Sequence, residues 1–397
     1  MNEFDDLENT LATELRRRSG DVLTTPGLAG RARRQARTLR RRRAVAAGAA
    51  TALALVVAVP AVLSLRDGPQ TAPPVRPAPT SSTTTELVVD GMRVGAPPSI
   101  GYLAGDTFHR TDGSTVELPA GLRDVLEVPG GFYGTSLTAT GPEIQNFDES
   151  GRYQSTLDGA GPVLSPDGAL MAYYDANSGV VWAGPPDGGT GPLSHAVPPG
   201  QRVDPVGFLD DHRLVSNVET DAEPWAGVHI DGFGVGPDDG AWETPPWDVL
   251  RVGAVSTGAG LVAGMTESSD TGSCWAVFED GAAEPLWRTC DYSFTRFSLD
   301  GRHLLGTAPS PDDEGNPFAV IVNARTGAVV HTYTGRFVHD AAFEDNEHVL
   351  ISVVLDGGGE REAALLRCDL DGACELAAPV VPADQNGYAY ELARQFW

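Results

Sequence analysis

The stretch PVLSPDGALMAYY, residues 162–174, decides the fold when it is set beside RFSLDGRHLLGTA, residues 296–308. In both, a short apolar segment is followed by a Ser-x-Asp-Gly turn and then by a second apolar segment. Aspartate and glycine accept the backbone geometry of tight turns, and short apolar runs bounded by such turns are typical of buried strands. Each stretch is therefore predicted to be a pair of antiparallel strands.

The same unit recurs four more times, at residues 125–137, 205–218, 254–265 and 341–354. The six turns lie near positions 130, 167, 210, 258, 300 and 345, so they are 37 to 48 residues apart. Repeats of this length are typical of four-stranded propeller blades, because a ring of sheets lets each sheet cover its neighbour. The turn residues that the comparison singles out are Asp167, Gly168, Asp210, Asp211, Asp300, Gly301 and Asp345.

Residues 86–397 are therefore predicted to form an all-β domain with the fold of a β-propeller. Six turns are visible, and a further strand pair is predicted at residues 100–118. Together with the sequence after residue 376, this pair would form a seventh blade closed by both ends of the domain. We favour seven blades over six.

The turn units SPDG at residues 165–168 and SLDG at residues 298–301 resemble the WD40-like and Tol-type propeller repeats of bacterial proteins. The likeness covers roughly residues 90–380, and the whole layout resembles the single-pass, propeller-bearing membrane proteins of high-G+C bacteria. The Gly-His and Trp-Asp dipeptides of eukaryotic WD40 repeats are missing, since the one Trp-Asp, at Trp247, has no repeat context. The resemblance therefore implies no eukaryotic-type partner.

Residues 44–65, AVAAGAATALALVVAVPAVLSL, carry no charge. As a helix they would be roughly 33 Å long, which matches the hydrocarbon core of a bilayer. Residues 1–43 hold 11 arginines and 6 acidic residues, and the positive-inside rule places such a segment in the cytoplasm. We predict one transmembrane helix in the lipid bilayer of the cell membrane, with the later residues extracytoplasmic. A cleaved signal peptide and a buried soluble helix are the alternatives.

Composition identifies a spacer and excludes several functions. Residues 67–85 contain five prolines and seven Ser or Thr, so residues 66–85 are predicted to be an extended linker. The chain has no lysine, which excludes lysine-dependent phosphate loops and Schiff-base chemistry. Its formal net charge of −26 argues against nucleic acid as a partner.

All four cysteines lie in the segment predicted to be extracytoplasmic. Cys274 and Cys290 bracket one predicted hairpin, and Cys368 and Cys374 bracket another. Facing residues of antiparallel strands are close enough for a disulfide, and an oxidising exterior preserves it. We predict two structural disulfides with this sequential pairing, in preference to a zinc site or a redox dithiol.

No catalytic, cofactor-binding or metal-binding residue is predicted. The chain has no G-x-S-x-G or H-E-x-x-H motif, its eight histidines are scattered, and no acidic cluster completes a calcium loop. The domain is expected to bind a protein, peptide or glycan without transforming it. The alternative, a tethered hydrolase or lactonase, would need carboxylates or histidines from several blades in the central channel.

The cytoplasmic segment contains an apolar stripe. Phe4, Leu7, Leu11 and Leu15 are spaced by three and four residues, which predicts a short amphipathic helix. The stripe could serve as a membrane anchor, or it could dock on a cytoplasmic regulator as a helix in a groove. The segment is similar in layout to the heads of membrane-bound anti-sigma factors, which implies a sigma factor or regulator as partner. It lacks their zinc-binding H-x-x-x-C-x-x-C motif.

Overall fold

The structure is a computed structural model that describes residues 83–394 apart from eight short gaps. The gaps are residue 120 and residues 139–141, 188–192, 234–241, 270–271, 310–315, 358–359 and 384–388. Within the described residues the regular elements are β-strands, and none of them forms a helix long and apolar enough to cross a bilayer. Residues 1–43, predicted to be cytoplasmic, and the span predicted at 44–65 lie outside the described residues.

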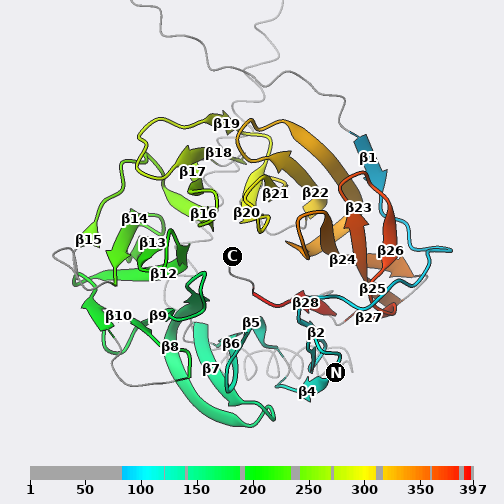
Figure 1. Ribbon diagram of the computed structural model, residues 1–397, viewed down its shortest axis with the longest axis horizontal. Coiled ribbons are helices and arrows are strands. Elements are labelled where there is room, and N and C mark those ends of the chain that lie inside the picture. Colours follow the sequence, from blue (N-terminus) through cyan, green and yellow to red (C-terminus); the bar gives the residue numbers. More distant parts are fainter. Residues whose placement is uncertain are drawn as a thin grey trace, which may run out of the picture. The chain divides into compact units, whose positions relative to one another are not determined.

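Strand pairing places all but two of the described strands in seven four-stranded groups around a common axis, which we number as blades 1 to 7 (Figure 1). The two others, β1 (Thr83–Glu86) and β27 (Val381–Pro382), pair with β23 and β25. The strands of each blade are given from the innermost outward. Blade 1 consists of β28 (Tyr390–Leu392), β2 (Tyr102–Ala104), β3 (Thr107–His109) and β4 (Thr115–Glu117), and blade 2 consists of β5 (Arg123–Val128), β6 (Gly131–Leu137), β7 (Pro142–Asp148) and the first half of β8 (Tyr153–Leu164). Blade 3 consists of the second half of β8, β9 (Met171–Asp175), β10 (Val180–Gly184) and β11 (Leu193–Ala196). Blades 4 and 5 are β12 (Gln201–Phe208), β13 (Arg213–Thr220), β14 (Gly227–Gly232) and β15 (Trp242–Glu243); and β16 (Arg251–Ser256), β17 (Leu261–Ser269), β18 (Gly272–Glu279) and β19 (Trp287–Thr289). Blades 6 and 7 are β20 (Ser293–Phe297), β21 (His303–Thr307), β22 (Asn316–Asn323) and the first half of β23 (Val329–Phe343); and the second half of β23, β24 (His348–Gly357), β25 (Glu360–Asp369) and β26 (Cys374–Leu376).

Blade 1 is completed from both ends of the domain. Its inner strand β28 pairs antiparallel with β2, with Tyr102 opposite Leu392 and Ala104 opposite Tyr390. In the other six blades the inner and second strands follow each other in sequence and are joined by a turn. This difference explains why six turns are visible in the sequence although the described residues form seven blades.

The hydrophobic core consists of seven clusters among the described residues, one between each pair of neighbouring blades. Phe108 of blade 1 and Phe132 of blade 2, for example, are both fully buried and pack edge to face at 5.2 Å. A fully buried side chain of this size stabilises a fold by about 1.5 to 3 kcal/mol. Because the middle strands are covered on both faces, β21 is buried at all three of its central residues.

The end of the predicted spacer belongs to the propeller. β1 (Thr83–Glu86) pairs in parallel with the first half of β23, and Thr83 and Thr85 each hydrogen-bond one ring nitrogen of the buried His331 at 2.9 Å. Burial lowers the pKa of His331, which favours the neutral ring with one donor and one acceptor nitrogen. Residues 83–85 are therefore strand, although their composition indicated a spacer.

Both predicted disulfides are confirmed. Cys274 is bonded to Cys290 and Cys368 to Cys374, with Cα atoms 4.0 and 4.1 Å apart, and the described residues include no free cysteine. Cys368 and Cys374 face each other directly in the β25–β26 pair. Each bond therefore links the third strand of one blade to the outer edge of the same blade.

A buried ion pair holds the segment that leads into blade 1. Glu344 and Arg367 form this pair with side chains that are 3% and 13% exposed, and Arg367 also donates to the carbonyl oxygens of Ala96 and Pro97 at 2.9 Å. Burial alone would raise the pKa of Glu344, but hydrogen bonds from Arg367 and the Ser99 backbone N–H lower it below its usual value. The pair therefore stabilises the fold above the unfolded-state pKa of about 4.3, and this contribution is lost as the pH falls through the lower, folded-state pKa.

We expect Arg367→Met to lower the free energy of unfolding by about 3 kcal/mol, because it leaves the buried Glu344 carboxylate without a cationic partner. Arg93→Met is the matched control. Both Arg367 and Arg93 form an ion pair with Glu375, but the Arg93 side chain is 84% exposed. The control should cost less than about 1 kcal/mol in urea denaturation followed by tryptophan fluorescence. Equal losses in the two variants would contradict this account of the pair.

We expect the two disulfides to contribute unequally, because they close loops with sequence separations of 16 and 6 residues. Replacing Cys274 and Cys290 by alanine should lower the free energy of unfolding by about 3 kcal/mol, against about 2 kcal/mol for Cys368 and Cys374. Urea denaturation of the two double variants measures both values. Wild type treated with a reductant provides the control, and a larger loss for the shorter loop would refute the expectation.

Candidate functional site

The turn residues predicted from the repeats lie where an inner strand passes to the second strand of a blade. Asp167 accepts hydrogen bonds from Ser165 Oγ at 2.6 Å and the Ala169 N–H at 2.9 Å, and Asp300 accepts the equivalent bonds from Ser298 and Arg302. Gly168 and Gly301 have φ values of 68° and 65°, a backbone conformation that favours glycine. The Ser165 hydroxyl is the main cause of the lowered pKa of Asp167.

Two more of the six predicted turns, near residues 210 and 345, are built in the same way. Asp210 accepts the backbone N–H groups of His212 and Arg213, and Asp345 accepts those of Glu347 and His348. Asp211, the remaining predicted turn residue, is exposed. These carboxylates are occupied in forming their own turns, so the predicted turn residues do not converge on one site.

The apolar stripe predicted at Phe4, Leu7, Leu11 and Leu15 lies outside the described residues.

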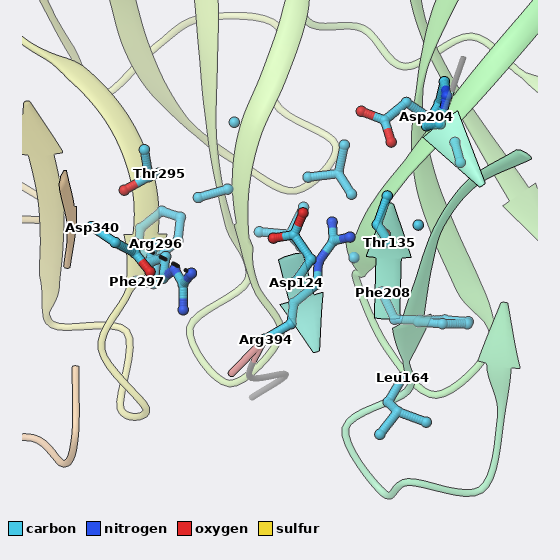
Figure 2. A pocket seen from close by; sticks show the side chains of 18 of the residues that line it. Asp124, Thr135, Leu164, Asp204, Phe208, Thr295, Arg296, Phe297, Asp340 and Arg394 are labelled. Carbon is cyan, nitrogen blue, oxygen red and sulfur yellow. Dashed lines mark ion pairs between the residues drawn. The ribbon is translucent and has the colours of Figure 1, made fainter. Parts of the chain in front are cut away.

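A cavity of about 840 Å³ lies among the inner strands, and no residue of it was predicted from the sequence. Its lining residues come mainly from the inner strands β5, β8, β12, β16, β20 and β23 and from the residue that follows β28, and single residues come from β6, β7, β9, β13, β21 and β22. Figure 2 shows part of this lining. The acidic side chains among the lining residues are Asp124, Asp158, Asp204, Glu219 and Asp340, and the arginines are Arg202, Arg296 and Arg394. Cavities of this volume hold small molecules or single side chains of a larger partner.

One group of charges in the wall holds the closing strand in place. Asp340 accepts the Leu392 N–H at 3.2 Å and lies 3.7 Å from Arg296, which also approaches the Ala393 carbonyl oxygen at 3.5 Å (Figure 2). Beside them, His339 Nε2 lies 3.0 Å from Glu391 Oε1. These side chains are already engaged in joining blade 1 to blades 6 and 7.

Arg394 reaches across the cavity wall from the end of β28. Its backbone N–H donates to the Val125 carbonyl oxygen at 2.9 Å, and its Nη2 approaches the Pro205 carbonyl oxygen at 3.5 Å. A Cβ atom at Gly161 would lie 2.4 Å from Nη1, so glycine leaves the space that the guanidinium occupies. Figure 2 shows this guanidinium beside Asp124.

Asp204 is a half-buried acid whose carboxylate has no hydrogen-bond partner among the described residues. It is directed into the cavity (Figure 2). Burial raises its pKa; Arg394 and Arg251 oppose this rise and Asp124 adds to it. Thr135 of blade 2 lines the same cavity, and its buried hydroxyl oxygen has no hydrogen-bond partner among the described residues. A buried polar group without a partner is costly, so both groups have capacity for a ligand.

The cavity was missed because its polar residues come from several different repeats and are far apart in the sequence. A signal was present in the repeats: Asp124, Asp204, Arg296 and Asp340 each precede their own turn by four to six residues. Aligning the inner strands by their turns would have shown charge in strands that are otherwise apolar. Within the described part of the chain, no group of three His, Cys, Asp or Glu side chains is arranged to hold a metal ion.

No protein-family model and no curated protein matches the chain. Solved structures similar to it include the β-propeller domain of Cps50 (Swd1) from Myceliophteria thermophila, at 12% identity and a TM-score of 0.44, covering 68% of this chain and 98% of that one. A candidate 6-phosphogluconolactonase from Bacteroides uniformis is similar at 16% identity and a TM-score of 0.45, covering 74% and 99%. The fold assignment itself rests on the strand pairing described above.

Proposed function

We propose that the protein is a membrane-anchored, extracytoplasmic β-propeller that binds a protein, peptide or glycan at its central cavity without transforming it. The observation that carries this proposal is a cavity of about 840 Å³ among the inner strands, whose lining includes the Asp204 carboxylate and the unpartnered hydroxyl of Thr135. The two disulfides support an extracytoplasmic position, because such bonds persist in oxidising surroundings. The uncharged residues 44–65 support the anchor.

A tethered hydrolase or lactonase is the second candidate, and one observation favours keeping it. Asp124 and Asp204 come from different blades and line the same cavity, as a pair of acid and base groups would. If this candidate is right, the full chain will hydrolyse members of a panel of lactones and esters, and Asp204→Asn will abolish the turnover. An unchanged rate in Asp204→Asn would exclude the cavity as the catalytic site.

The location can be tested in intact cells. We expect added protease to digest the propeller while residues 1–43 remain protected, and we expect the chain to fractionate with membranes. Deleting residues 44–65 should abolish both results, because the deletion removes the only long uncharged segment before the domain. A mature protein found free in the culture fluid, or a propeller resistant to protease in intact cells, would overturn the anchor.

We also propose that the stripe of Phe4, Leu7, Leu11 and Leu15 docks on a cytoplasmic sigma factor or regulator. Full-length protein in detergent should retain such a partner in a pull-down, and Leu11→Arg should abolish the retention by placing a charge in the apolar stripe. Thr13→Arg is the matched control, because it adds the same charge to the opposite face of the predicted helix. Equal retention by wild type and Leu11→Arg would leave only the role of a membrane anchor for the stripe.

A further inference from the structure

The charges of the central cavity are unbalanced toward the negative. Five acidic side chains and three arginines line it, and the arginines are partly engaged elsewhere. Arg296 contacts Asp340 and the Ala393 carbonyl oxygen, while Arg202 lies 3.8 Å from Asp221 with a side chain that is 59% exposed. The remaining arginine, Arg394, lies against the backbone of blades 3 and 4.

The acidic side chains of the cavity differ in how many hydrogen-bond or ion-pair partners they have. Asp340 accepts the backbone N–H groups of Ala341 and Leu392 and faces Arg296, so its oxygens have partners. The carboxylates of Asp124, Asp158, Asp204 and Glu219 accept no hydrogen bond from a described residue; Asp124 and Asp158 are exposed, whereas Asp204 and Glu219 are half-buried. Asp204 is the half-buried acid that is directed into the cavity and whose pKa burial raises, so its carboxylate is the acceptor most in need of a partner (Figure 2).

The surroundings of Asp204 favour one ligand charge over the others. Its own strand also contributes the apolar residues Val203 and Phe208 to the cavity lining, and burial raises the pKa of the Asp204 carboxyl, so its charge is incompletely compensated there. An anion would meet Asp124 and Asp204 as well as Arg394, and a neutral hydroxyl ligand would donate hydrogen bonds but leave the charge in place. A cation with N–H groups supplies both the charge and the hydrogen bonds.

We propose that the central cavity binds a ligand through a protonated amino or guanidinium group, with the Asp204 carboxylate as its counter-ion. The inference rests on the proposed binding role of the cavity and names the chemical class of the ligand. The Thr135 hydroxyl also lines the cavity and has no hydrogen-bond partner among the described residues, so it is a second polar group of the lining that lacks a partner. The cationic group can belong to a small amine or to a lysine or arginine side chain of a peptide.

The test is isothermal titration calorimetry on the full chain in detergent, with probes of similar size and different charge. Butylammonium and agmatine are the cations, 1-butanol is the neutral probe, butyrate is the anion, and glucose represents a polyol. A second series uses short peptides with one central lysine, arginine or glutamine, which separates a peptide ligand from a free amine. We expect the cations, or the lysine and arginine peptides, to bind at least about tenfold more tightly than the neutral and anionic probes.

Asp204→Asn should weaken binding of the cations by at least about tenfold, because the variant keeps the shape of the side chain and removes its charge. Asp167→Asn is the matched control, since Asp167 lies in a surface turn and is not part of the cavity wall; its binding should match that of wild type. Circular dichroism of both variants establishes that the fold is retained.

Each other outcome overturns the inference in a recognisable way. Binding of glucose, 1-butanol or butyrate in preference to the cations would refute the amine class and leave the cavity as a binding site. Cation binding that survives Asp204→Asn would place the cation site elsewhere. If no probe binds at millimolar concentration, both the ligand class and the proposed use of the cavity fail.

Discussion

The pairing of β28 with β2 is the constraint on which the rest of the structure depends. A four-stranded blade cannot bury both of its faces alone, so every blade needs a neighbour on each side, and only a closed ring provides one everywhere. Tyr390 and Leu392 of β28 are buried in the cluster between blades 7 and 1. Without β28, this cluster would lose two of its members and β2 would present an unpaired edge.

The same closure builds the cavity. Three consecutive residues from the end of β28 onward, Leu392, Ala393 and Arg394, contact different blades with their backbone or side-chain atoms. Their partners are Asp340 of blade 7, Arg296 of blade 6, Val125 of blade 2 and Pro205 of blade 4. The strand that seals the ring therefore also brings a guanidinium to the cavity wall. Folding and the formation of the site are one event in this architecture, because the wall is assembled only when the ring is closed.

Features formed by residues close together in the sequence, such as the turns and the disulfides, could be predicted. Features formed by residues far apart in the sequence, such as the β1 pairing and the cavity, could not. The turns at Asp167 and Asp300 were predictable because serine, aspartate and glycine make their hydrogen bonds within five residues. The disulfides were predictable because each brackets a single hairpin. β1 was assigned to the spacer because its partner, His331, is more than 240 residues away in the sequence. The cavity was missed for the same reason, since Asp124 and Asp204 belong to different repeats and their proximity depends on the ring.

A single strand, β23, connects the first described strand, β1, to the cavity wall. The first half of β23 is the outer strand of blade 6 and pairs with β1, while its second half is the inner strand of blade 7 and carries His339 and Asp340 in the cavity wall. The register shifts between these halves, near Val338, where the strand changes partners. The residues of β23 that contact β1 and the residues of β23 that contact the closing strand β28 are therefore separated by only a few residues of continuous backbone. Two strands, β8 and β23, each belong to two blades, and β23 is the one that connects the first described strand, β1, to the proposed ligand site.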